Sequence, residues 1–240
     1  MKTLPIDTIL EHLENGEIHM EGYVPWGSNY TFVVTMTYND QEMQAVYKPR
    51  EGERPLWDFP TGTLCSREYA TYLVSNWLGW DLVPPTILRD GPQGWGSVQY
   101  FIDHDPDENF FTFRDDHAES LQLTALLDII VNNADRKGGH VLVSENGRLW
   151  AIDHGIAFHD EPKLRTVIWD YAGEPIQENY LNDLKKLTTE LANQGELYQQ
   201  LAALLSGREL KAFQARIQQV LYTKQLPEPG PGRPYPWPLV

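Results

Sequence analysis

Residues 132–155 read NNADRKGGHVLVSENGRLWAIDHG, and they are the most informative part of the sequence about its structure. Within it, residues 141–144 and 148–152 are apolar and strand-like. Between them lies Asn146-Gly147, the pair favoured in two-residue type I′ turns. The stretch therefore predicts a β-hairpin.

The register of this hairpin predicts where its polar side chains lie. With Glu145 opposite Arg148, His140 falls opposite Asp153 at the open end. Directly opposed Cβ atoms are about 4.5 to 5.5 Å apart, so these two side chains can share one divalent ion. Asp135 precedes the hairpin on a polar loop that enters the same end. We therefore expect three polar groups to converge there.

The segment before this loop predicts a buried helix. Residues 120–131 (SLQLTALLDIIV) are apolar almost all round, which is typical of a helix in the centre of a lobe. Elsewhere, alternation and turn residues predict strands over 18–36 with a break at 22–29, a strand over 42–48, and a hairpin of 83–88 with 96–102. Helical periodicity predicts helices over 4–14, 64–78, 177–193, 196–205 and 207–222.

Composition restricts the class of protein. The 240 residues, 41% of them hydrophobic, suffice for one large domain or two closely packed lobes. The net charge of -15 repels phosphate backbones, so nucleic acid is not expected as the main ligand. Cys65 is the only cysteine, which excludes an intrachain disulfide. No apolar run reaches about 18 residues, so we expect a cytoplasmic protein with no integral membrane association.

Two short motifs within residues 132–155 resemble a known family. The sequence Asn133-Ala-Asp135-Arg136 is similar to a catalytic loop, and Ile152-Asp153-His154-Gly155 is similar to the metal-binding segment that follows it. Together they resemble the phosphoinositide 3/4-kinase and HipA-like branch of protein-kinase-like enzymes, and more narrowly a small bacterial family of such kinases.

The resemblance extends toward the N-terminus and covers roughly residues 18–160. Ala45-Val-Tyr-Lys48 resembles the strand lysine that holds ATP phosphates, and Glu68 on the next predicted helix is its natural partner. The resemblance implies an α+β, bilobal protein-kinase-like fold. Its parts would be an antiparallel β-rich N-lobe (1–102), a mainly helical C-lobe (103–226) and a proline-rich tail (227–240).

The resemblance also implies a cofactor and roles for individual residues. The cofactor would be ATP with Mg or Mn, and the acceptor would be a hydroxyl group of a protein, lipid or small molecule. Asp135 would accept or orient that hydroxyl. Arg136 or Lys137 would stabilise charge on the transferred phosphoryl group. The other implied contacts are His140 and Asp153 with the metal, Ser28, Asn29 and Lys48 (paired with Glu68) with the phosphates, and the backbone of Gln99, Tyr100 and Phe101 with adenine.

Departures from the family pattern leave other functions open. The second metal position, usually Asn, is His140 here, and His suits softer metals such as Mn more than Mg. One alternative is therefore a nucleotide-binding pseudokinase without turnover. Another is a metal-dependent hydrolase, whose ligands would be His117, Asp135, His140, Asp153 and His154. The tail is either a polyproline ligand for another protein or a strap on the second lobe.

Overall fold

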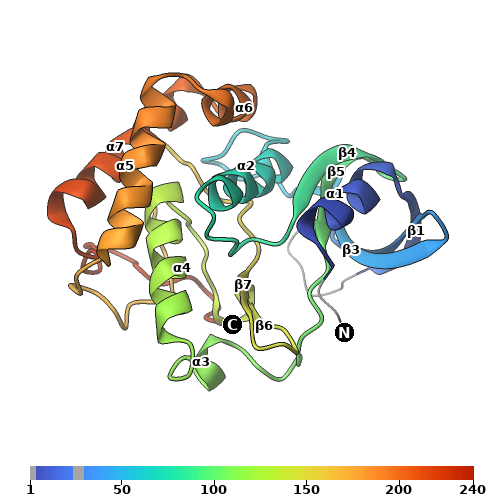
Figure 1. Cartoon of the computed structure of the whole chain (residues 1–240), viewed down its shortest axis with the longest axis horizontal. Helices are drawn as coiled ribbons and strands as arrows, with labels where there is room; N and C mark the ends of the chain where they lie inside the picture. Colours follow the sequence, from blue (N-terminus) through green and yellow to red (C-terminus); the bar gives the residue numbers. More distant parts are fainter. Residues whose placement is uncertain (1–3, 24–29) are drawn as a thin grey trace.

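The computed structural model describes residues 4–23 and 30–240. Its N-terminal part is a five-stranded antiparallel sheet with strand order β1-β2-β3-β5-β4 (Figure 1). The elements are α1 (Ile6–Asn15), β1 (Glu17–Tyr23), β2 (Phe32–Tyr38), β3 (Gln41–Pro49), the short 3-10 helix η1 (Arg50–Gly52), α2 (Leu64–Trp77), β4 (Thr86–Gly91) and β5 (Gly94–Tyr100). Every predicted element in this part is present, with ends that differ by a few residues.

Alternation along β3 gives the sheet its two faces. Met43, Ala45 and Tyr47 are buried and pack with α1 through Ile9 and Leu13. Because successive strand residues point to opposite faces, Lys48 extends away from this core and toward the rest of the chain.

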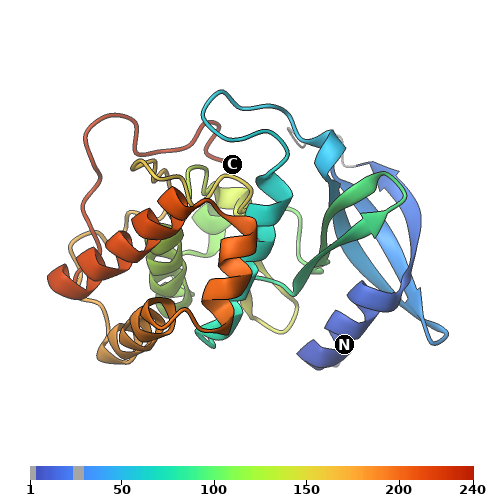
Figure 2. The same cartoon turned by 90° about the horizontal axis from the view of Figure 1, so that it is seen from above.

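The remainder of the chain is mainly helical and packs beside the sheet (Figure 2). The central helix α4 is buried almost all round, as its apolar sequence predicts, and contacts α7. The elements are α3 (Phe110–Phe113), α4 (Ala118–Val131), the 3-10 helix η2 (Gly138–His140), β6 (Val141–Val143), β7 (Leu149–Ala151), α5 (Glu178–Ala192), α6 (Glu196–Leu204) and α7 (Gly207–Thr223). A β-rich part and a helical part therefore follow each other as predicted.

The register predicted for the β6–β7 hairpin is wrong by one residue. Val141 pairs with Ala151 and Val143 with Leu149, and Ser144 donates its N–H to the carbonyl of Arg148 at 3.0 Å. The connection has three residues instead of two. A type I′ turn needs positive φ at both central residues, but within this connection only Gly147 has one, at 78°.

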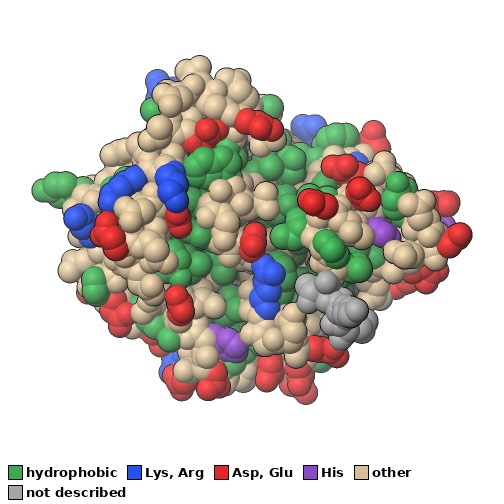
Figure 3. Space-filling model, in the orientation of Figure 1, with side chains coloured by type: hydrophobic (Ala, Val, Ile, Leu, Met, Phe, Trp, Pro, Cys, Tyr) green, Lys and Arg blue, Asp and Glu red, His purple; other side chains and the backbone are tan. Residues whose placement is uncertain are grey.

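The surface is mainly acidic, and the proline-rich tail lies on the helical part. Figure 3 shows acidic side chains spread over both parts of one face, with the basic ones in small separate groups. Residues 227–240 run back from α7 as an extended strap (Figure 2). The carbonyl of Pro234 accepts from Thr166 N at 3.0 Å, and that of Leu239 accepts from Gly138 N at 2.7 Å. Across the described ranges, no helix has the length and apolar character needed to span a membrane.

Candidate active site

Three charged side chains from distant parts of the sequence meet between the sheet and the helical part. Lys48 extends from β3, Glu68 from α2, and Asp153 follows β7. The Lys48 Nζ lies 2.5 Å from Glu68 Oε1 and 3.0 Å from Asp153 Oδ1. The sequence-predicted lysine, its helix partner and the hairpin aspartate therefore meet at one junction between the sheet and the helical part, which we call the cleft.

The charges of Lys48 and Asp153 stabilise each other. Burial alone would lower the pKa of Lys48, but Asp153 and Glu68 outweigh it and raise that pKa above its usual value. Burial would likewise raise the pKa of Asp153, yet Lys48 and His140 hold that pKa well below its usual range. The pKa of Glu68 is raised by burial, which Lys48 only partly offsets. The ammonium of Lys48 and the carboxylate of Asp153 are thus both charged near neutral pH. A positive charge suits the phosphates of a nucleotide, and a negative charge suits the cation that accompanies them.

His140 reaches Asp153 although the two are not opposed in the hairpin. The residue opposite His140 is Ile152, whose N–H donates to the His140 carbonyl at 3.0 Å. Asp153 then adopts a left-handed conformation with φ of 59°. Its Oδ2 lies 3.2 Å from His140 Nε2. The predicted pair therefore forms because the left-handed conformation of Asp153 allows its side chain to reach His140.

The protonation of His140 suits a metal ligand. Burial lowers the pKa of His140 to about 4, although Asp153 opposes the shift, so the imidazole is neutral near pH 7. Its Nδ1 lies 2.9 Å from the carbonyl of Asp135, which can only accept, so the proton resides on Nδ1. The Nε2 lone pair then faces the Asp153 carboxylate with no proton between them.

A divalent cation fits this pair of donors. Two ligands at about 2.1 Å in adjacent octahedral positions lie about 3 Å apart, close to the 3.2 Å separation observed. No group of three or more His, Cys, Asp or Glu side chains within residues 4–23 and 30–240 is arranged to hold a metal. His140 and Asp153 would thus hold Mg or Mn only together with other ligands, such as the phosphates of a nucleotide.

Asp135 lies on the loop before the hairpin, beside Lys137. The Lys137 Nζ is 3.3 Å from Asp135 Oδ2. Burial raises the pKa of Asp135 to about 6, against the opposing effect of Lys137. Asn133 fixes the loop by accepting the Asp135 N–H on its Oδ1 at 3.0 Å. A carboxylate with this pKa is suited to accept a proton near neutral pH.

Arg136 is placed differently from the prediction. Its side chain is fully buried against Asp128, with Nε at 2.8 Å and Nη2 at 2.9 Å from the two carboxylate oxygens. Its Nη1 donates to the carbonyls of His140 at 2.9 Å and Ile152 at 2.6 Å. The guanidinium therefore has no free face for a phosphoryl group and instead holds together the loop and the hairpin that carry the site.

Two buried acids that are not among the predicted site residues position the site. Asp128 accepts from Arg136 and from Asn133 Nδ2, the latter at 2.9 Å. Its signal was present, because it is the only charged residue in the apolar run 120–131. Glu209 at the start of α7 pairs with buried Arg67, the neighbour of Glu68 on α2. Nothing in the sequence links those two positions.

The residues predicted to contact adenine are partly engaged in the sheet. The Tyr100 N–H donates to Pro85 O at 2.8 Å and the Phe101 N–H to Gln44 O at 3.2 Å. The side-chain amide of Gln99 is buried and donates to Thr86 Oγ1 at 2.8 Å. Because β5 continues to Tyr100, the next main-chain donor along this segment is Ile102. Ser28 and Asn29 lie outside the described residues.

The ligand set predicted for a hydrolase is not assembled. His117 precedes α4 and packs edge-on against Phe113 at 5.6 Å between ring centroids. His154 is fully buried, and its Nε2 lies 2.6 Å from Arg136 Nη2. Neither imidazole joins His140 and Asp153, so the hydrolase alternative loses its metal site.

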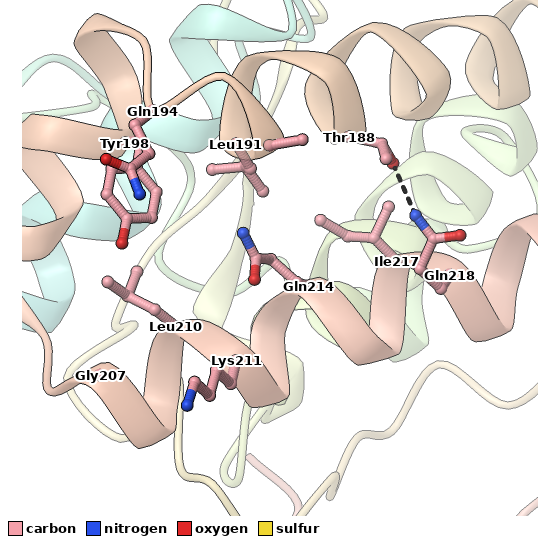
Figure 4. A pocket seen from close by; sticks show the side chains of 11 residues that line it. Thr188, Leu191, Gln194, Tyr198, Gly207, Leu210, Lys211, Gln214, Ile217 and Gln218 are labelled. Atoms are coloured by element: carbon pink, nitrogen blue, oxygen red, sulfur yellow. Dashed lines mark hydrogen bonds between the residues drawn. The ribbon is translucent and has the colours of Figure 1, made fainter.

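The helical part also contains a hollow of about 540 Å³ that is separate from this cleft (Figure 4). Side chains of α5, α6 and α7 line it, and Gln218 Nε2 donates to Thr188 Oγ1 across it at 3.3 Å. Among the described residues that line it, Lys211 is the one cation and there is no carboxylate. The hollow therefore lacks the groups that the chemistry of the cleft requires.

The fold and the cleft together define a protein-kinase-like domain, and comparisons with known proteins agree. A profile of the family Phosphatidylinositol 3- and 4-kinase matches residues 88–201. The chain is 38% identical over 261 residues to Protein Rv2133c of Mycobacterium tuberculosis, covering 94% of this chain and 93% of that protein. It therefore belongs to the family of Protein Rv2133c, within the protein-kinase-like superfamily.

More distant likenesses agree with this assignment. Phosphatidylinositol 4-kinase gamma 3 of Arabidopsis thaliana is 26% identical over 204 residues, covering 68% of this chain but only 36% of the plant protein. The crystal structure of the Helicobacter pylori proinflammatory kinase CtkA superposes with a TM-score of 0.52 at 12% identity, covering 88% of this chain and 94% of that one. The chain thus has the bilobal fold of protein-kinase-like proteins.

Proposed function

We propose that this protein transfers the γ-phosphoryl group of ATP to a hydroxyl acceptor with the aid of a divalent metal. The observation that carries the proposal is the contact of Lys48 with both Glu68 and Asp153. Surface lysines seldom pair with two carboxylates, one of them buried. In protein kinases, such a lysine holds ATP phosphates while the aspartate holds metal.

Each residue of the cleft has a role in this proposal. Lys48 binds the nucleotide phosphates, and Glu68 keeps the lysine in place. His140 and Asp153 would hold Mg or Mn, which supplies positive charge to neutralise the phosphates. Asp135 takes up the proton of the acceptor hydroxyl, and Lys137 at its side neutralises charge near the transferred group. The main-chain segment from Gln99 to Ile102 would contact adenine.

The pKa of Asp135 favours an enzyme over a pseudokinase. A base is most effective when its pKa lies near the operating pH, and burial raises the pKa of Asp135 to about 6. The pseudokinase remains the alternative that a turnover measurement decides.

Thermal melting with ATP tests the nucleotide site. A ligand present at a hundred times its Kd stabilises the folded state by about 2.7 kcal/mol, or about 5 to 11 °C for a chain of this size. We expect this shift with ATP and Mg or Mn together, and its loss in Asp153→Ala. The matched control is Asp170→Ala, which removes an exposed carboxylate paired with Arg114 and should keep the shift. An equal shift in Asp153→Ala would contradict the proposal.

A further inference from the structure

The proline-rich strap, residues 227–240, ends beside the catalytic loop. Leu239 gives its carbonyl to the N–H of Gly138, which is three residues after Asp135. Pro234 gives its carbonyl to Thr166 N and also to the indole Nε1 of Trp169, at 3.2 Å. Three N–H donors of the helical part therefore bind main-chain oxygens of an extended segment.

These donors flank the loop that carries the proposed base. Thr166 forms a parallel bridge with Arg136, in which Arg136 N donates to Arg165 O at 2.9 Å and Val167 N donates to Arg136 O at 3.0 Å. Gly138 lies two residues beyond Arg136 on the same loop. The strap thus runs along two adjoining segments, one of which is the loop that carries Asp135.

The strap makes incomplete contact with the helical part. Prolines at 234, 236 and 238 have no N–H to donate. Pro236 is buried, but Trp237 is 75% exposed and Val240 59% exposed. A hollow of about 480 Å³, lined by Arg165 and Arg233 among others, separates part of the strap from residues 162–169. The strap is therefore only partly packed against the helical part.

The part of the strap nearest the catalytic loop cannot accept phosphate. Residues 236–240 are Pro-Trp-Pro-Leu-Val and contain no hydroxyl group. The hydroxyl of the strap that comes next in the sequence belongs to Tyr235, four residues before the Leu239 carbonyl that binds Gly138.

We propose that Gly138, Thr166 and Trp169 form a docking groove for an extended, proline-rich polypeptide acceptor, and that the strap fills this groove from the same chain. The inference rests on the proposed phosphotransferase function. It names a protein as the acceptor because the N–H groups of Thr166 and Gly138 and the indole N–H of Trp169 bind two main-chain carbonyls of an extended segment, an arrangement that recognises a polypeptide backbone. Phosphorylation of such an acceptor requires the strap to leave.

Peptide binding tests the groove without knowledge of the acceptor. The probe is the labelled peptide PYPWPLV, which corresponds to residues 234–240, and the receptor is the chain ended at Arg233. We expect this shortened protein to bind the peptide at least tenfold more tightly than the full chain, because the strap no longer competes. The control peptide PYDWPLV, which replaces the buried proline by aspartate, should bind at least tenfold more weakly. Equal binding to both proteins, or no binding to either, would overturn the proposal.

ATP measurements on the same proteins separate this inference from the proposed function. The shortened protein should show the same metal-dependent ATP melting shift as the full chain and should consume ATP faster with water as acceptor, and added PYPWPLV should slow it again. Peptide binding without an effect on ATP consumption would overturn the groove. A missing ATP shift in every protein would instead refute the phosphotransferase function, whatever the peptide does.

A second variant serves if the shortened chain does not fold. Pro236→Asp in the full chain should release the strap and speed hydrogen exchange at the Gly138 and Thr166 amides at least tenfold, whereas Trp237→Ala, which alters an exposed ring of the same strap, should not. Unchanged exchange in Pro236→Asp would refute a displaceable strap. Loss of folding in both the shortened chain and Pro236→Asp would show a structural strap and would equally overturn the proposal.

Discussion

Replacing Arg136 by Ala should destabilise the fold more than any surface charge substitution. The guanidinium is fully buried and makes bonds to both oxygens of Asp128 and to the carbonyls of His140 and Ile152. Without it, the carboxylate of Asp128 remains buried with only the amide of Asn133 as a side-chain partner. Breaking a buried ion pair by removing one partner costs about 3 to 5 kcal/mol. We expect a loss of that size.

The measurement is urea unfolding followed by tryptophan fluorescence. A loss of 3 to 5 kcal/mol corresponds to a fall in Tm of about 6 to 20 °C for a chain of this length. The matched control is Arg114→Ala, because Arg114 pairs with Asp170 at 3.0 Å with both side chains more than a third exposed. Exposed pairs contribute about 0 to 1 kcal/mol. The same assay on both variants therefore compares a buried with an exposed arginine pair.

The result also decides between two roles for Arg136. If Arg136 stabilised charge on the transferred phosphoryl group, as the sequence predicted, Arg136→Ala would lose activity but unfold like Arg114→Ala. The structure instead predicts that Arg136→Ala has a much lower free energy of unfolding than Arg114→Ala. A free energy of unfolding within about 1 kcal/mol of the Arg114→Ala value would refute the buried-pair reasoning.

Three further predictions concern single side chains. Because burial raises the pKa of Asp135 to about 6, its basic form is lost as pH falls through that value. The rate of phosphate transfer should therefore drop about tenfold per pH unit below pH 6. A rate profile that is flat from pH 7 to 5 would contradict this. His140→Asn should bind ATP with Mg and lose preference for Mn over Mg, because an amide oxygen is a harder ligand than imidazole; comparison of ATP Kd values in the two metals checks this, and an unchanged ratio would exclude His140 from the metal site. Burial raises the pKa of Cys65 to about 12, so iodoacetamide at pH 8 should label this thiol only after the protein unfolds. Mass spectrometry measures the labelling. Rapid labelling of the native protein would contradict the buried position of the thiol.

Local pattern was sufficient to predict the strands and the longer helices, but not the four-residue helix α3 or every contact between the elements. Alternation and helical periodicity located the strands and helices, because those signals arise from neighbouring residues. The register of the 141–151 hairpin was wrong because Asn-Gly favours a two-residue turn, whereas bonds of Asn146 Oδ1 to Ser144 and Arg148 accompany a three-residue turn. The pairing of His140 with Asp153 nevertheless formed, through a positive φ at Asp153 that the sequence did not signal.

The cleft was predictable from the order of its charged residues, while its buried supports were not. Lys48, Glu68 and Asp153 occur in the order that a kinase-like fold requires, so the resemblance brought them together. Arg136 was misassigned because a motif gives its position next to Asp135 but not the direction of its side chain. That direction is set by Asp128, whose proximity depends on the packing of the whole helical part.

Phosphoryl transfer with Asp135 as the base predicts that the protein consumes ATP and that this consumption depends on Asp135. Wild-type protein and Asp135→Asn would be incubated with ATP and Mn for a prolonged period, after melting shifts establish that both bind nucleotide. We predict that the wild type converts ATP to ADP and that Asp135→Asn does so about 10² to 10⁴ times more slowly. A wild type that binds ATP but leaves it unchanged would contradict the claim and identify the protein as a pseudokinase.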